Sequence, residues 1–178
     1  MEMNFCRRCG KPLESADGHV FRCGTGHTLY LNSSPATAVF FIADDNQRVL
    51  LTTRDREPFK GMLEGPGGFL DEHETFIEAT HRELKEELGI TPDDYEPLQY
   101  LSEGYVEYPF GGEVVPVACI GFWSRLYPNV KLQPMDDVSA VNWYDLHELD
   151  LARLSAPDIH NGILALRKLF PQERGNDV

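Results

Sequence analysis

The chain concentrates acidic side chains in one short helical segment. Glu83, Glu86 and Glu87 lie close together among strong helix formers. At 3.6 residues per turn, Glu83 and Glu87 are one turn apart, and Glu86 lies three residues beyond Glu83. Because like charges at these spacings repel each other and weaken a helix, we expect a cation beside them. Carboxylate oxygens suit Mg2+ or Mn2+, so these three glutamates are the predicted ligands.

The flanking residues indicate a tight loop followed by a helix. Gly67 and Gly68 allow the backbone to turn sharply and to approach a ligand closely. Acidic residues at the start of the segment, near Glu74, and Gly89 at its end are typical of the two ends of a helix. Four residues form a stripe that we predict to face the core: Ile77, His81, Leu84 and Leu88.

The spacing in this segment resembles the Nudix box at all nine of its fixed positions. Those positions are Gly68, Glu74, Arg82, Glu83, Leu84, Glu86, Glu87, Gly89 and Ile90. A solvated acidic helix face would explain two or three glutamates, but it does not explain nine residues at fixed spacing. The resemblance implies an α/β fold, the Nudix αβα sandwich with a mixed sheet.

The resemblance also implies a reaction. Nudix hydrolases cleave the pyrophosphate bond of a nucleoside diphosphate linked to another moiety, with Mg2+ activating water and neutralising charge. It places Glu83, Glu86, Glu87, Arg82 and Glu74 in the catalytic site and Gly67 and Gly68 beside the substrate. We expect Arg82 to pair with Glu74 and to hold the loop on the helix. The general base stays open between Glu83 and an acid outside the box, which could be Glu103, Glu107, Glu113, Asp136 or Asp137.

The N-terminal cysteines indicate a second metal site. Cys6 and Cys9 are separated by 13 residues from a second pair, Cys23 and His27, and together they offer the four ligands of a structural Zn2+ site. The segment resembles the zinc ribbon that precedes the catalytic domain in NADH pyrophosphatases and relatives of ADP-ribose pyrophosphatase. Those ribbons carry a fourth cysteine where this chain has Gly26, so His27 is the expected substitute and His19 a weaker alternative.

The substrate depends on residues outside the box. After it, NADH pyrophosphatases carry an array rich in aromatic and proline residues, which this chain matches only in part around Tyr108 and Phe110. Either side chain could stack on a base or a nicotinamide, although a hydrophobic turn is the simpler interpretation. NADH and ADP-ribose are the leading substrates. A triphosphate-cleaving housecleaning enzyme and a catalytically silent nucleotide-binding regulator are the alternatives.

Composition limits the classes of partner. The formal net charge of −13 argues against binding to nucleic acid, and no apolar run approaches the roughly 20 residues of a membrane span. The start of the chain lacks the apolar region of a signal peptide, so we expect a cytoplasmic protein that acts on a small nucleotide. Because many Nudix proteins are dimers, a homodimer stays open.

The remaining pattern gives the expected organisation of the chain. We predict a zinc ribbon over residues 1–34, a Nudix domain over 35–171 and a flexible tail over 172–178. Strands are expected at 35–43, 48–53, 98–108, 114–125 and 138–144. Residues 147–149 are expected in a late helix, and Ser155 or Asp158 is expected to cap the last helix. Cys119 reads as a core strand residue rather than a ligand.

Overall fold

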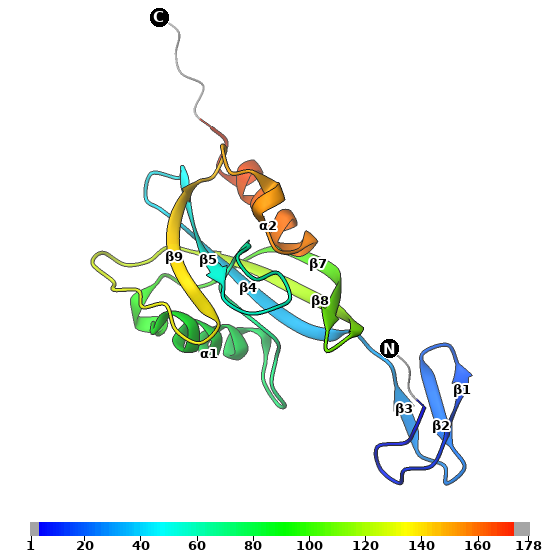
Figure 1. Cartoon of the computed structure of the whole chain (residues 1–178). Helices are drawn as coiled ribbons and strands as arrows, with labels where there is room; N and C mark the ends of the chain where they lie inside the picture. The colour runs from blue at the N-terminus through cyan, green and yellow to red at the C-terminus, as the bar shows by residue number, and fades with distance from the viewer. Residues whose placement is uncertain (1–3, 173–178) are drawn as a thin grey trace, which may run out of the picture.

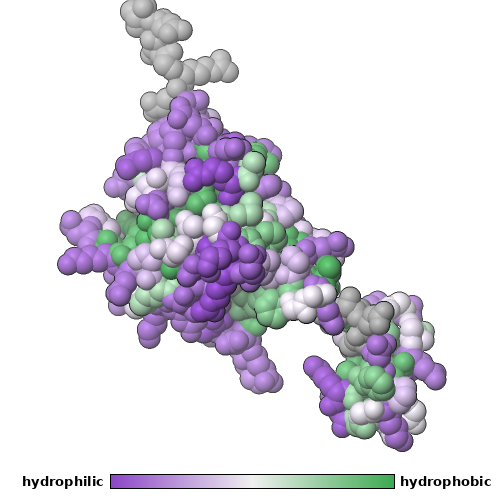
Figure 2. Space-filling model, viewed as in Figure 1, coloured by the Kyte–Doolittle hydropathy of each residue, from purple (hydrophilic) through white to green (hydrophobic). Residues whose placement is uncertain are grey.

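The computed structural model describes residues 4–172, which form a small N-terminal sheet and a larger body (Figure 1). The small sheet forms a lobe of its own beside the body (Figure 2). Most of the tail predicted at 172–178 lies outside the described residues. Neither helix of the described part has the length and hydropathy needed to cross a membrane.

The N-terminal sheet has three short antiparallel strands around a very small core. They are β1 (Leu13–Asp17), β2 (Val20–Cys23) and β3 (Thr28–Tyr30), in the order β1-β2-β3. The buried side chains are Cys6, Cys23 and Leu29, with Leu13 packed against them. So small a core buries little apolar surface, which is why lobes of this size ordinarily need a metal or a disulfide.

The body is built on a mixed sheet. Its strands are β4 (Ser34–Ile42), β5 (Arg48–Arg54), β6 (Leu63–Glu64), β7 (Gln99–Phe110), β8 (Glu113–Ser124) and β9 (Val138–Asp145). The order is β6-β5-β4-β8-β7, and β9 pairs with β5. Strands β4 and β8 run parallel, whereas the other pairs are antiparallel. The predicted strands and the mixed sheet are confirmed.

The two helices cover opposite faces of this sheet (Figure 1). Along β4, Val39 and Phe41 pack toward α1 (Phe76–Leu88), whereas Ala38, Phe40 and Ile42 pack toward α2 (Pro157–Leu169). Successive side chains of a strand point to opposite faces, so a continuous apolar run is buried on both sides. The αβα sandwich expected from the resemblance is confirmed.

Helix α1 begins and ends where the sequence indicated. Thr75 and Glu78 form a capping box at its start, and Gly89 ends it in the left-handed region with φ of 71°. The predicted stripe is wrong at its first residue, because Ile77 is 40% exposed. Phe76 packs against the core instead, one turn before the buried Thr80, and Leu84 and Leu88 continue the same row.

Two expectations near the end of the chain are also wrong. Residues 146–148 form a turn and residue 149 is not helical, because the Asp145 carboxylate accepts hydrogen bonds from the N–H groups of His147 and Glu148. Helix α2 is preceded by Ala156, which offers no side-chain cap, so neither Ser155 nor Asp158 fills that position. Pro157 stands at the first helical residue, where its missing N–H is harmless.

Gly162 lets α2 approach the sheet, and replacing it with alanine should destabilise the protein. A Cβ at this position would collide with the Phe40 ring. Overpacking of this kind costs about 1–3 kcal/mol, which exceeds the gain of about 1 kcal/mol in helix propensity. We therefore expect Gly162→Ala to lower the free energy of unfolding in urea, whereas the exposed Lys168→Ala should change it by less than about 0.5 kcal/mol. A stabilised Gly162→Ala protein would contradict this packing.

Candidate active site and candidate metal centre

A glycine loop after β6 is pressed between β4 and α1. The loop is held on β4 because the N–H groups of Val39 and Thr37 donate to the carbonyls of Pro66 and Gly68, at 2.8 and 2.9 Å. A Cβ on Gly67 would collide with the carbonyl oxygen of Thr37, and one on Gly68 would collide with the Glu83 carboxylate. Gly67 therefore needs glycine, as the sequence suggested, whereas a side chain at Gly68 would displace the Glu83 carboxylate.

Two of the three predicted ligands lie beneath this loop. Glu87 is 3% exposed, and its carboxylate accepts a hydrogen bond of 2.9 Å from the Gly67 N–H. Burial raises its pKa to about 9, and the charge of Glu64 adds to the shift. Burial also raises the pKa of Glu83, which Arg82 partly offsets. Buried carboxylates that lack full compensation are the groups that a cation would stabilise.

Arg82 compensates the outer acids of the helix. Its guanidinium donates to Glu74 at 2.8 and 2.9 Å, to Glu83 at 2.8 Å and to Glu86 at 3.1 Å. It also donates to the Phe69 carbonyl at 2.9 Å, so the predicted link from loop to helix is present. Hydrogen bonds from Arg82 lower the pKa of Glu74 to about 2. The Glu86 side chain is 49% exposed, which places it at the outer edge of the group.

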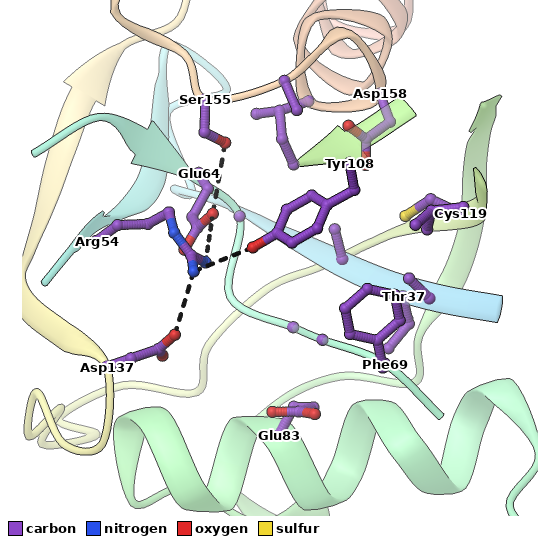
Figure 3. A pocket seen from close by; sticks show the side chains of 18 of the residues that line it. Thr37, Arg54, Glu64, Phe69, Glu83, Tyr108, Cys119, Asp137, Ser155 and Asp158 are labelled. Atoms are coloured by element: carbon purple, nitrogen blue, oxygen red, sulfur yellow. Dashed lines mark hydrogen bonds and ion pairs between the residues drawn. The ribbon is translucent and has the colours of Figure 1, made fainter. Parts of the chain in front are cut away.

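The opposite wall of the site consists of Arg54, Glu64 and Asp137 (Figure 3), of which the sequence singled out only Asp137, as a candidate base. Arg54 donates to both Glu64 oxygens at 2.9 and 3.2 Å, and its second terminal nitrogen lies 3.5 Å from Asp137. Burial raises the pKa of Glu64 to about 7 against the opposing charge of Arg54. These residues come from β5, β6 and the segment before β9, so no local motif joins them.

Aromatic side chains form part of the rim of the same pocket. Tyr108 has ring neighbours in Phe59, Phe69 and Phe110, with centroid separations of 5.9, 5.7 and 6.5 Å. The Tyr108 hydroxyl accepts a hydrogen bond of 3.3 Å from Arg54, which ties this group to the buried wall. Both predicted stacking residues therefore line the pocket, together with Phe59 and Phe69, which the sequence did not single out.

Most of these groups line one pocket with a volume of about 390 Å³, whereas the predicted site residues Glu74 and Glu86 lie outside its lining. Three arginines line it, namely Arg54, Arg56 and Arg82, beside the acids of α1. Asp136 and Asp137 are also in the lining. The other three candidate bases, Glu103, Glu107 and Glu113, are exposed on β7 and β8 and do not line it. Cys119 is buried in β8, as expected, and its side chain also borders the pocket.

The N-terminal sheet brings the predicted zinc ligands together. The donor atoms of Cys6, Cys9, Cys23 and His27 all lie within 4.8 Å of one another. The Cys9 and Cys23 sulfurs are 3.7 Å apart, close to the roughly 3.8 Å that tetrahedral zinc with bonds of about 2.3 Å requires. Hydrogen bonding from the Thr25 hydroxyl lowers the pKa of Cys9 to about 7, which favours the thiolate. The group fits a structural zinc ion.

Sequence comparison gives a family and two curated relatives. A model of the NUDIX domain matches residues 33–166. The ADP-ribose pyrophosphatase of Methanocaldococcus jannaschii is 46% identical over 66 residues, which cover 37% of this chain and 38% of that protein. The mitochondrial NAD(P)H pyrophosphatase NUDT13 of Mus musculus is 26% identical over 149 residues, which cover 83% and 40%. The chain thus spans less than half the length of either relative.

A solved structure has the same fold. The NUDIX hydrolase from Nitrosomonas europaea is 18% identical and superposes with a TM-score of 0.69. The superposition covers 96% of this chain and 94% of that one. It therefore takes in most of the N-terminal sheet as well as the body.

The zinc site predicts a difference between two histidines. We expect purified protein to carry about one zinc per chain, and His27→Ala to reduce that content well below one, because a ligand of the tetrahedral set is removed. His19→Ala is the matched control and should keep its zinc, because His19 lies outside the set and makes a ring contact with Tyr30. Elemental analysis measures both. Zinc loss in the His19 variant alone would reassign the fourth ligand.

The raised carboxyl pKa values predict that Mg2+ stabilises the protein more at high pH. Since the folded pKa values of Glu64 and Glu87, about 7 and 9, exceed their ordinary 4.5, the cation-free protein loses stability as pH rises from 4.5 through 9. Below pH 6, protons compete with the cation for the same oxygens. We expect the rise in Tm on adding Mg2+ to be larger at pH 8.5 than at pH 6.

The pH effect has a clear control. In Glu87→Gln one of the titrating carboxyls is absent. The rise in Tm caused by Mg2+ should therefore differ less between pH 8.5 and pH 6 than it does in the unmodified protein. Equal increments at both pH values in the unmodified protein would show that no carboxyl in the pocket exchanges its proton for the cation.

Proposed function

Because the NUDIX model covers residues 33–166, the chain belongs to the Nudix family, and we propose that it is a pyrophosphohydrolase. Its proposed substrate is a nucleoside diphosphate linked to another moiety, with NADH and ADP-ribose the leading compounds. The names of the two curated relatives support this choice. The proposal divides the chain into a ribbon over 1–34 and a catalytic domain over 35–171.

One observation carries the proposal, namely the buried Glu87 carboxylate and the half-buried Glu83 carboxylate beneath the glycine loop. Glu83 and Glu87 border a pocket that also holds Arg54, Arg56 and Arg82. In this proposal the carboxylates hold Mg2+ or Mn2+, with Glu86 at the outer edge, and the arginines attract the pyrophosphate. When bound, the cation would neutralise charge that develops on the phosphate oxygens and lower the pKa of the attacking water.

The other residues of the site have positioning roles in this proposal. Arg82 and Glu74 hold the loop on α1, and the N–H of Gly67 fixes the orientation of the Glu87 carboxylate. Tyr108 and Phe110 offer ring faces at the rim of the pocket for a base or a nicotinamide. Glu83 and Asp137 stay the candidates for the general base, because both line the pocket.

The substrate class is tested by release of a nucleoside monophosphate. We expect turnover of ADP-ribose or NADH with Mg2+ or Mn2+, little turnover without either cation, and weaker turnover of nucleoside triphosphates. A chromatographic assay across these compounds measures all three. Triphosphates as the best substrates would identify the housecleaning alternative, and no turnover of any compound would identify a nucleotide-binding regulator.

The metal assignment is tested by Glu87→Gln. We expect kcat/KM to fall by on the order of 100-fold or more, because an anionic ligand of the cation is lost. The fold should persist, because an amide has nearly the shape of the protonated carboxyl that burial favours here. Glu103→Gln, exposed on β7 outside the pocket, is the matched control and should retain activity. Full activity in Glu87→Gln would refute the ligand assignment.

A further inference from the structure

The pocket extends beyond the carboxylates to a second end between the sheet and α2 (Figure 3). This end is bounded mostly by small and apolar side chains: Ala36, Ala38, Val106, Val117, Cys119 and Ile159. Two of them, Ala36 and Ala38, are alanines of the central strand β4, where a larger side chain would fill the space. These side chains belong to the core between the sheet and α2, so this end of the pocket is an apolar recess in the surface of that core.

A carboxylate stands in this apolar surrounding. Asp158 lies in the first turn of α2 and lines the pocket. Its Oδ1 atom is buried and, among the described residues, has no hydrogen-bond partner. Burial raises the pKa of the neighbouring Cys119 thiol, and the charge of Asp158 and a hydrogen bond with its side chain add to the shift, so the protonated thiol is one donor to this carboxylate. A buried acceptor without a donor is unfavourable, and such groups in native structures ordinarily have a partner.

The backbone is shaped to place Asp158 at this position. Gly104 of β7 lies directly under it, and a Cβ on Gly104 would stand 2.7 Å from the Asp158 Cβ and 3.0 Å from its Cα. Any larger residue at 104 would push the start of α2 away from the sheet. The position of the carboxylate thus depends on a glycine in a strand, where glycine is otherwise unfavourable.

A carboxylate offers several acceptor sites, so Oδ1 can take a further donor besides the Cys119 thiol. The carboxylates of α1 already mark the end of the pocket that suits a cation and a pyrophosphate. A nucleotide held there extends to either side of its phosphates, and the flat groups at its two ends are a base and, in NADH, a nicotinamide. The amine of adenine and the carboxamide of nicotinamide both supply N–H donors on a flat ring.

On the basis of the proposed function, we propose that Asp158 forms a specificity subsite, in which its carboxylate accepts a hydrogen bond from an amino N–H on a flat ring of the substrate. The walls of Ala36, Ala38 and Val117 contact the ring, and Oδ1 accepts from its amino group. The subsite selects substrates by this donor, whereas the glutamates of α1 act on the pyrophosphate that all candidates share.

The test compares two matched pairs of substrates: ADP-ribose with its hypoxanthine counterpart, and NADH with its hypoxanthine counterpart. At the ring edge that faces the subsite, hypoxanthine has a carbonyl where adenine has the amine, and an N1–H where adenine has an acceptor nitrogen. If the base occupies the subsite, kcat/KM should favour both adenine compounds by about 10- to 100-fold, the range expected when a buried polar group loses its hydrogen bond. In Asp158→Asn that preference should vanish or invert, because the amide can donate to the carbonyl.

A nicotinamide in the subsite gives a different pattern. Asp158→Asn would then weaken both dinucleotides equally and leave the two ADP-ribose compounds unchanged. Gly104→Ala should reproduce the loss of selectivity with Asp158 still present, provided that its circular dichroism and melting curve show a folded protein. Glu107→Gln, exposed on β7 outside the pocket, is the matched control and should keep the original ratios.

Two outcomes are separated by this design. A change of the same factor on all four substrates in Asp158→Asn, or no change on any, would overturn the subsite while hydrolysis itself shows that the proposed function holds. Absence of hydrolysis of all four by the unmodified protein would count against the proposed function. In that case, equal dissociation constants for the four compounds, measured by calorimetry with Asp158 present, would overturn the subsite separately.

Discussion

The site depends on the burial of negative charge under the glycine loop. Glu87 is almost fully buried, and its carboxylate accepts a hydrogen bond from the N–H of Gly67. One neutral donor does not replace the hydration of a carboxylate, which is why its pKa rises to about 9. The fold accepts this unfavourable arrangement where a cation can relieve it, and strain of this kind is characteristic of functional sites.

The rest of the architecture keeps that arrangement in place. The loop is anchored on β4 by hydrogen bonds to Thr37 and Val39, and β4 is fixed between the two helices by side chains that alternate between its faces. Arg82 then closes the group from outside by bonding to Glu74, Glu83 and Glu86. Because the loop touches both β4 and α1, a shift of either element would move the backbone that positions Glu87.

Local patterns predicted most of the fold, and in the site they predicted the glycine loop and the charged residues of α1. The capping residues, the glycine after α1 and the strand runs act over a few residues, so they could be read directly from the chain. The stripe on α1 was wrong at Ile77 because Phe76 and Ile77 are both apolar, and only the position of the sheet decides between them. The helix predicted at 147–149 was wrong for a related reason. The Asp145 carboxylate accepts hydrogen bonds from the backbone N–H groups of the following turn, which prevents a helix there.

The wall of the pocket opposite α1 follows from sheet order, and only Asp137 of its three residues was singled out from the sequence. Arg54, Glu64 and Asp137 belong to β5, β6 and the segment before β9, and β5 brings them together by pairing with both of the other strands. A sequence motif contains residues that lie on one helix or loop. The residues of this wall are distant in sequence and become neighbours only through the pairing of strands in the sheet. Chemistry common to a family can be encoded in the motif, because every member needs the same carboxylates. Selectivity can change with one residue on another element, as at Asp158 in α2, without disturbing the helix that carries those carboxylates.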